Sequence, residues 1–462
     1  MRIENKTHKF QSLFFIRSTW LIIILFLFVN IIIFIYADPI RYQPFRYGGL
    51  HLVLDLENYK LIDPRTPSIP YTKWPPGFAL FLKAFLPISN APCFHIVTII
   101  QIGFLLIIGL VLRYLVERNL PGYGNIALLF MVFNPNSLTF ANIVAAENLH
   151  ALTVFGAFAG AVLFVYNPRI WPAILCGFSL GLSCWARPIT QYLVLLLPFV
   201  FPFLALVSIH KFRYFRDFGA GVFAMLIAVL IMLPWLLHMQ KAGEGFRMHS
   251  HASEYTFLKD IITYIEHEQL KNEGGGLRVK TKEELPQKYN NWEELSPVQQ
   301  SILKTEYAYD YIKSNPYPLH VIATTTVISW LRTLVAGGAG EVHYLFGIKA
   351  KRTNPKDSFT YSYLPDSNYT SFYGLKILCE SFSVMMRILG LIGIWQLIRR
   401  REYGILSVVI GLVSFIVLAH LLAGRPRFRI PIEAPLMMLS VYGVEWIRNK
   451  FFMNIGKPIN RD

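Results

Sequence analysis

The sequence predicts an α-helical protein that crosses a membrane many times. Of its 462 residues, 54% are hydrophobic and 15% aromatic, and the mean hydropathy is +0.42. The apolar residues form uncharged windows of about 20 residues, the length at which a helix crosses ~30 Å of hydrocarbon. The windows lack the alternation of a barrel strand, and a chain in lipid must satisfy its backbone groups internally, so we expect helices.

Ten windows predict membrane spans and an eleventh is weaker. The first is too long for a secretory signal and ends in bulky residues, so we expect it to be retained. The ten windows are 19–37, 94–112, 123–141, 149–165, 170–186, 191–209, 218–237, 374–398, 403–423 and 430–447. The weaker window, 319–336, contains Arg332 and three consecutive threonines, which favours a helix lying at the membrane interface. The alternative for this window is an eleventh span.

The distribution of Lys and Arg predicts the orientation. With both termini in the cytoplasm, the short segments on that side hold far more basic than acidic residues, including the arginine triplet 399–401. The loop 238–318 carries nearly equal numbers of both. The net charge of +16 therefore reflects topology, and the scatter of basic residues among short loops speaks against a nucleic-acid partner. We expect a multi-pass protein of the cell inner membrane.

The chain divides into three predicted parts. Residues 1–237 form an N-terminal transmembrane module with a first outer loop at 38–92. Residues 238–373 form a mainly helical extracytoplasmic loop region that includes the interfacial helix near 319–336. Residues 374–462 form the C-terminal transmembrane helices. The four cysteines have no metal-ligand spacing and lie mostly in or beside apolar runs, so we expect them to pack and not to bind zinc or form disulfides.

The first outer loop contains residues that could perform chemistry. Asp55 and Glu57 form a carboxylate pair that could hold a cation or activate a hydroxyl, although a solvated loop explains them equally well. Lys73 precedes a Pro75-Pro76-Gly77 turn, after which the chain becomes apolar. This arrangement would hold the lysine near the headgroup plane, where it can meet a phosphate.

Further charges lie at the outer ends of predicted spans. Glu147 begins the fourth span, either as a functional carboxylate or as an acid favoured by the helix dipole. Arg187 ends the fifth span, where a structural arginine that extends to the interface is the alternative. Arg425, Arg427 and Arg429 precede the last span on the outer side, against the positive-inside trend, which indicates an anion such as phosphate.

The order of these motifs resembles that of the GT-C fold glycosyltransferases, and most closely the bacterial protein-mannosyltransferase-like and lipid A arabinosyltransferase-like families. The resemblance covers nearly the whole chain. Its motifs are Asp55 with Tyr59, the Pro-Pro-Gly segment 75–82, Asn134-Pro135 followed by Glu147, the Gly-Leu-x-x-x-x-Arg-Pro segment 181–188, and the Arg-Phe-Arg-x-Pro segment 427–431. The sequence departs from the pattern at Ala146, where a serine is common, and at Trp74, which separates Lys73 from the prolines.

The resemblance implies a GT-C-like fold of about 10–11 transmembrane helices and an inverting transfer of a sugar at the periplasmic or lumenal face. The donor would be a polyprenyl-phosphate sugar, and the acceptor a hydroxyl on a lipid, a glycan or a protein. Asp55 would be the base, positioned by Tyr59, while Glu147 would orient the acceptor or share a cation. The residues expected to bind the substrate and its phosphate are Glu57, Tyr59, Lys73, Arg187, Arg425, Arg427 and Arg429. A divalent cation, Mg²⁺ or Mn²⁺, could bind at Asp55 and Glu57.

Two other functions fit a polytopic chain. A transporter or lipid flippase would show repeated halves and polar groups near the midplane, whereas here no repeat is evident and the polar groups lie at outer helix ends. An enzyme like the O-antigen ligases or polymerases would act at the same face, but we would not expect it to carry the Asp55 and Pro-Pro-Gly motifs together.

Overall fold

The computed structural model describes residues 2–36, 53–55, 60–62, 75–84, 93–208, 213–268, 276–289, 291–314, 317, 319–335, 370–419 and 426–451. The helices are α1 (Arg2–Tyr36), α2 (Gly77–Lys83), α3 (Cys93–Asn119), α4 (Gly124–Val132), α5 (Pro135–Ala141), α6 (Ala146–Tyr166), α7 (Ile170–Ala186), α8 (Gln191–Val207), α9 (Tyr214–Lys241), α10 (His251–Glu268), α11 (Gly276–Lys288), α12 (Pro297–Ser314), α13 (Leu319–Val335), α15 (Thr370–Arg399), α16 (Tyr403–Ala419) and α17 (Glu433–Phe451). The 3-10 helices η2 (Pro188–Thr190) and η3 (Pro426–Ile432) precede α8 and α17. Strands β1 (Val53–Asp55) and β2 (Lys60–Ile62) pair antiparallel.

The prediction of a helical, multi-pass membrane protein is confirmed. Among the described residues, six helices are long and apolar enough to cross a bilayer: Arg17–Tyr36, His95–Asn119, Ala146–Tyr166, Pro188–Val207, Phe215–Lys241 and Ile377–Arg399. Helices α7 and α16 are apolar but have only 17 residues each, which is the lower limit for a crossing. Helix α17 has 19 residues and carries charges at both ends. Glu433 at its start is part of a buried ionic cluster described below, and Arg448 and Lys450 lie in its last turn.

One predicted span, 123–141, is two helices. Asn134 adopts an extended conformation between α4 and α5, and its side chain accepts hydrogen bonds from the N–H groups of Asn136 and Ser137. Pro135 then occupies the first turn of α5, where its missing N–H is not needed. The Asn-Pro pair therefore ends one helix and caps the next, and it turns polar side chains into the bundle.

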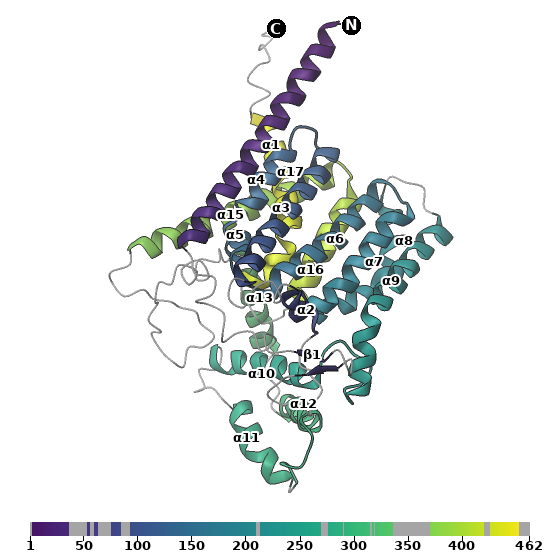
Figure 1. The fold of residues 1–462 in the computed structure, drawn as a ribbon, viewed down its shortest axis with the longest axis vertical. Helices are drawn as coiled ribbons and strands as arrows, with labels where there is room; N and C mark the ends of the chain where they lie inside the picture. Colours follow the sequence, from purple (N-terminus) through teal and green to yellow (C-terminus); the bar gives the residue numbers. More distant parts are fainter. Residues whose placement is uncertain are drawn as a thin grey trace.

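The helices are arranged so that α1 begins and α17 ends at the same end of the molecule, while α10, α11, α12 and the β1–β2 pair lie at the other (Figure 1). We call the end that carries α10, α11 and α12 the outer end; that it faces away from the cytoplasm stays a prediction. An even number of crossings produces this arrangement, which favours ten spans over eleven. Helix α13 lies between the outer helices and the bundle (Figure 1). Its place at the membrane interface stays a prediction.

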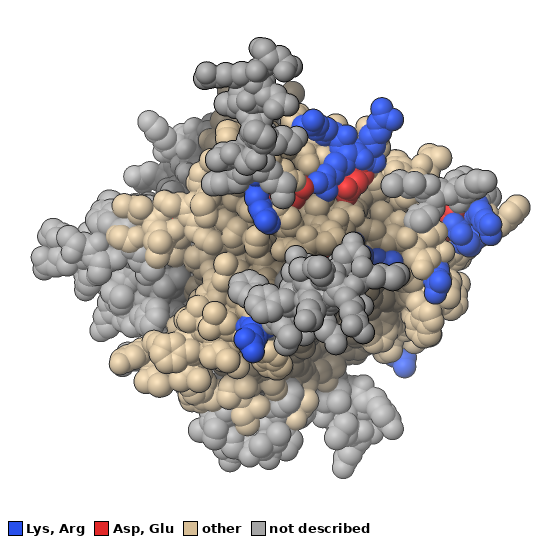
Figure 2. Space-filling model, turned by 90° about the horizontal axis from the view of Figure 1, so that it is seen from above, with Lys and Arg blue, Asp and Glu red and all other residues tan. Residues whose placement is uncertain are grey.

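The end at which α1 begins is rich in basic side chains. Figure 2 shows Lys and Arg gathered over parts of this face, with acidic side chains beside only some of them. Arg118, Arg399, Arg448 and Lys450 lie in the last turns of α3, α15 and α17. This is the distribution that the positive-inside rule predicts for a cytoplasmic face.

Helices α15 and α17 approach each other closely at two glycines. A Cβ on Gly393 would lie 2.0 Å from the carbonyl oxygen of Leu439, and one on Gly443 would lie 2.1 Å from that of Leu389. Any other residue would force the two backbones apart, and close approach through small residues is how membrane helices gain packing energy without a hydrophobic driving force.

The outer helices have a small core of their own. Ile262 of α10, Leu277 of α11 and Ala308 of α12 are fully buried against one another. Tyr311 and Tyr317 both donate hydrogen bonds to Glu266, at 2.7 and 3.0 Å. These contacts tie three short helices into one unit beside the bundle, as the predicted mainly helical loop region requires.

Candidate functional site

Two of the predicted residues meet at the outer ends of α6 and α7. Glu147 lies in the first turn of α6, and its Oε1 is 2.5 Å from Nη2 of Arg187, which follows the last residue of α7. Pro188 favours the end of α7 at this point because a proline disfavours the helical conformation of the residue before it, and Arg187 is extended. The glutamate side chain is 9% exposed and the arginine 25%, so the pair sits at the edge of the protein where a ligand can still reach the guanidinium.

Arg187 also connects this pair to the last part of the chain. Its guanidinium carbon lies 5.6 Å from the centre of the Phe428 ring, within the range of a cation–π contact. Phe428 belongs to η3, directly before Arg429. Segments that are more than two hundred residues apart in the sequence therefore lie side by side at the outer end of the bundle.

The Pro-Pro-Gly segment of the first loop reaches the same place. A Cβ on Gly77 would lie 2.6 Å from the carbonyl oxygen of Trp185, so α2 rests directly on the last turn of α7. Phe78 and Leu82 are buried against Val144, just before α6. Only glycine permits this approach, and it holds the start of α2 beside the Glu147–Arg187 pair.

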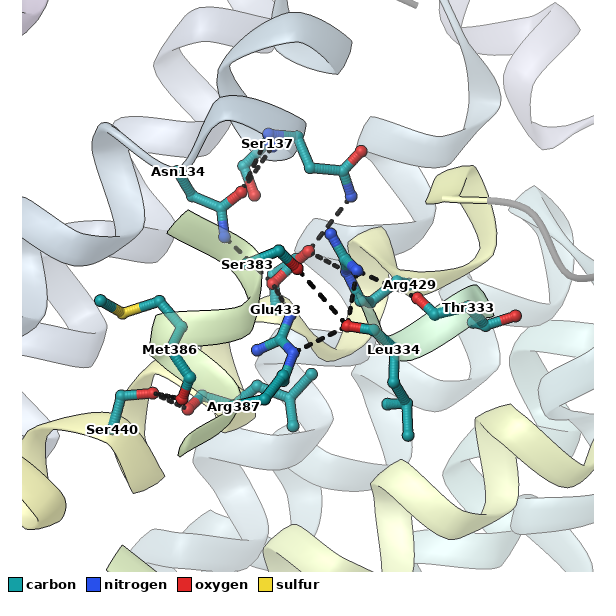
Figure 3. Close-up of polar contacts among 12 residues, drawn as sticks. Asn134, Ser137, Thr333, Leu334, Ser383, Met386, Arg387, Arg429, Glu433 and Ser440 are labelled. Atoms are coloured by element: carbon teal, nitrogen blue, oxygen red, sulfur yellow. Dashed lines mark hydrogen bonds and ion pairs between the residues drawn. The ribbon is translucent and has the colours of Figure 1, made fainter. Parts of the chain in front are cut away.

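Next to this pair lies a buried ionic cluster centred on Glu433, the first residue of α17 (Figure 3). Its carboxylate forms ion pairs with Arg429 and, at 3.0 Å, with Arg387 of α15. It also accepts hydrogen bonds from the side-chain amides of Asn134 and Asn136, at 3.0 and 3.1 Å. Glu433 is fully buried, so these four donors replace its hydration.

The guanidinium of Arg429 is engaged on two sides. In addition to Glu433, it donates hydrogen bonds to the backbone carbonyls of Thr333 and Leu334, at 3.1 and 2.7 Å (Figure 3). Its side chain is 1% exposed. A phosphate would therefore have to compete with these two carbonyls, and the assignment of Arg429 to phosphate binding stays a prediction.

The other predicted residues are less defined. Asp55 ends β1 opposite Lys60, and Arg427 lies in η3, but their side chains are outside the described part of the structure. Glu57, Tyr59, Lys73 and Arg425 are outside the described residues altogether. The proposed meeting of Asp55 with the arginines before the last span stays a prediction.

The described side chains include no group of three or more His, Cys, Asp or Glu residues that could hold a metal ion. Asp55 and Glu57, the predicted ligands, are not among those side chains. A divalent cation at this position therefore stays a prediction. The described cysteines Cys176, Cys184 and Cys379 are buried, as expected for packing residues.

Sequence reasoning missed Arg387 and the central position of Glu433. Arg387 interrupts an apolar run in the middle of α15, and a charge inside a membrane span is by default a candidate for function. That signal was available in the sequence. The pairing of Arg387 with Glu433 was not, because it depends on how α15 packs against α17.

Fold and site together define a polytopic helical membrane protein with a charged cluster buried at the outer end of its bundle. No family profile and no curated protein matches the sequence. Among solved structures, the chain is similar to the oligosaccharyltransferase of Archaeoglobus fulgidus in its apo form, with 13% sequence identity and a TM-score of 0.46. The match covers 84% of this chain and 44% of that one.

Proposed function

We propose that the protein is a membrane glycosyltransferase of the GT-C type that transfers a sugar from a polyprenyl phosphate to an acceptor hydroxyl. One observation supports this most: motifs from separate parts of the chain converge at the outer end of the bundle. Gly77 rests on α7, Glu147 pairs with Arg187, Arg187 stacks on Phe428, and Asn134 binds Glu433. A chance likeness of short motifs would not bring them into contact.

The proposed chemistry is a single displacement. The Asp55 carboxylate takes the proton of the acceptor hydroxyl while the acceptor oxygen forms a bond to the anomeric carbon. The bond between that carbon and the phosphate oxygen breaks on the opposite face, and the phosphate leaves with the electron pair. This sequence inverts the anomeric centre and needs no oxidant or reductant. A base in hydrogen-bond reach of the acceptor contributes about a hundredfold to ten-thousandfold to such a step.

Positive groups near the leaving phosphate would lower the barrier further. Arg187 is held by Glu147 but is a quarter exposed, so it can turn its remaining N–H groups to a phosphate oxygen. In this proposal Lys73, Arg425 and Arg427 approach the same phosphate, Tyr59 positions Asp55, and Glu57 with a Mg²⁺ or Mn²⁺ ion supports it. Glu147 keeps Arg187 oriented and faces the acceptor side.

The proposed setting follows from the charge distribution. The basic face of Figure 2 lies in the cytoplasm, and the site opens to the periplasm or lumen of a cell envelope whose inner membrane holds the protein. Donor and acceptor then arrive from the outer leaflet. The acceptor is a lipid, a glycan or a protein, and nucleic acid is not a partner.

The test is transfer by the purified protein in lipid nanodiscs supplied with polyprenyl-phosphate sugars. We expect Asp55→Asn to reduce transfer at least a hundredfold without loss of folded protein. Asp63→Asn, the same change further along the loop, is the matched control and should leave transfer unchanged. Normal transfer by Asp55→Asn would remove the proposed base. Accumulation of a lipid-linked sugar in cells that lack the protein would identify the donor, and transport of the intact lipid without transfer would instead identify a flippase.

A further inference from the structure

A groove opens on the side of the bundle between α15 and α17. Its volume is about 500 Å³, within the range of ligand-binding pockets. Residues three or four apart on α15, from Ile377 to Ile392, form most of its wall, and Ile447 of α17 completes it. This length of helix corresponds to about 22 Å, so the groove follows much of the depth of a bilayer. Ile377 and Ile388 are 63% and 55% exposed, and such side chains in a membrane span meet acyl chains.

The groove leads to two tryptophans at the basic end of the molecule, the end at which α1 begins (Figure 2). Trp395 follows Ile392 by three residues on α15, and Trp446 directly precedes Ile447 on α17. The two indole rings meet edge to face, with their centroids 5.3 Å apart. Tryptophan favours the boundary between hydrocarbon and headgroups. The groove therefore ends at the depth at which lipid headgroups begin.

Two cations lie against these two rings. The guanidinium carbon of Arg399 is 5.5 Å from the ring centre of Trp395, and Nζ of Lys450 is 4.8 Å from that of Trp446. Both cationic residues are exposed. A guanidinium stacked on a ring keeps its N–H groups at its edge, and an ammonium has three donors, so both cations can bind a phosphate while they contact the rings.

The two ends of the groove differ in charge. At the basic end, Glu402 and Glu445 lie 3.8 and 2.6 Å from Arg400, so these carboxylates compensate that arginine. At the other end the groove is lined by Glu380, which is about 28 Å from Arg399 along α15. An anionic headgroup would be repelled at Glu380 and attracted at the basic end. The charges therefore determine the direction in which a lipid would lie in the groove.

We propose that this groove binds one membrane phospholipid with an anionic headgroup, taken from the leaflet at the basic end. The lipid phosphate lies between Arg399 and Lys450, its glycerol rests on the tryptophan pair, and one acyl chain fills the groove. No covalent step is involved. The site is at the opposite end of the bundle from the Glu147–Arg187 pair, and it does not depend on the proposed sugar transfer.

The test is native mass spectrometry of the full chain released from dodecyl maltoside micelles and titrated with dioleoyl phosphatidylglycerol or dioleoyl phosphatidylcholine. The two lipids have the same acyl chains, but choline cancels the charge of the phosphate. We expect one phosphatidylglycerol to bind at least about tenfold more tightly than phosphatidylcholine, since each basic residue beside an anionic lipid contributes about fivefold.

The cations are tested one at a time. Arg399→Gln and Lys450→Gln should each weaken binding of phosphatidylglycerol by about fivefold. Arg118→Gln is the matched control, because it removes an exposed cation that is stacked on Tyr166 at 5.1 Å in the last turn of α3, at the same end of the molecule. This control should bind the lipid normally.

The groove has its own pair of variants. Ile388→Trp fills the groove without a change in charge and should weaken binding of phosphatidylglycerol at least about fivefold, because the acyl chain loses its place. Leu391→Trp, on the same helix but 66% exposed and outside the groove wall, should bind normally. Glycerophosphoglycerol, the headgroup without acyl chains, should not bind. The replaced side chains are all exposed, so we expect every variant to fold.

Three results would overturn the site. Equal affinity for the two lipids, or an equal loss from Arg118→Gln and Arg399→Gln, would leave only a general attraction to a positive face. Equal binding by Ile388→Trp and Leu391→Trp would remove the acyl chain from the groove. A dimer that Ile388→Trp abolishes and Leu391→Trp retains would mean that a second copy of the chain fills the groove. A protein that binds the lipid and transfers no sugar would contradict only the proposed function.

Discussion

Replacing Glu433 with glutamine tests how much the buried ionic cluster stabilises the bundle. Glutamine keeps the shape of the side chain but removes the charge that compensates Arg387 and Arg429. Its NH₂ group is also a donor, and it would face the donor groups of these arginines. Because Glu433 is fully buried, no water can replace the lost charge. Breaking a buried pair from one side costs about 3–5 kcal/mol, so we expect a loss in this range in the free energy of unfolding.

The same helix offers a matched control. Glu445 of α17 pairs with Arg400 at 2.6 Å, but that arginine side chain is 29% exposed and can turn to water when its partner is lost. Glu445→Gln should therefore cost only about 1–2 kcal/mol. The assay is unfolding of the protein in dodecyl maltoside micelles titrated with dodecyl sulfate and followed by tryptophan fluorescence.

Two results would refute this reasoning. The first is a Glu433→Gln variant that is no less stable than Glu445→Gln. The second concerns the double variant Glu433→Gln with Arg387→Gln, in which one uncompensated charge is also removed. If the residues act as one cluster, the double variant should be more stable than the sum of the single effects predicts, by roughly 1–3 kcal/mol. Strict additivity would mean that the two side chains do not share an energetic cluster.

Three further predictions follow from described contacts. Gly77→Ala should cost about 1–3 kcal/mol, because its Cβ meets the Trp185 backbone. Gly103→Ala, inside α3 with no atom within 4 Å, should be neutral or slightly stabilising, because alanine favours a helix; equal unfolding midpoints would contradict this. Burial lowers the pKa of His249 below 6.5, and the positive charge of Arg247 lowers it further, while Glu254 and Glu244 partly offset this effect. As the pH falls, the unfolded chain therefore binds the proton before the folded protein does. Stability should then be complete above about pH 6.5 and fall below it by at most about 1.4 kcal/mol per pH unit, and His249→Gln should lose this dependence in an unfolding series across pH 5–7.5. A cysteine at exposed Glu283 of α11 should react with an impermeant thiol reagent from outside the cell and one at exposed Arg401 should not; the opposite labelling would invert the proposed orientation.

The helical membrane architecture could be predicted from sequence because apolar windows of membrane-spanning length indicate directly that these segments lie in lipid. Helix ends were harder. The window 123–141 is uncharged and mostly apolar, and its division into α4 and α5 depends on Asn134 and Pro135, whose local chemistry outweighs the hydropathy of the window. The Asn-Pro pair was noted as a motif, but its effect as a helix cap was not deduced.

The candidate site was predictable in part. Glu147 and Arg187 were chosen as separate charges at helix ends, and the structure pairs them at 2.5 Å. Arg429 was chosen for phosphate, whereas the structure engages it with Glu433 and two backbone carbonyls. Sequence patterns report which residues are polar at a given depth, but they do not report how many other polar groups compete for the same side chain. Such competition arises only from tertiary packing.

The glycine contact between α15 and α17 has a consequence for how the protein adapts to its bilayer. Sliding by one residue would bring a side chain against the Leu439 or Leu389 carbonyl, so the two helices keep one register. A thicker or thinner membrane must then be accommodated by tilting the pair as a unit. Arg387 and Glu433 lie on these two helices, so their mutual distance should stay constant across lipids of different chain length.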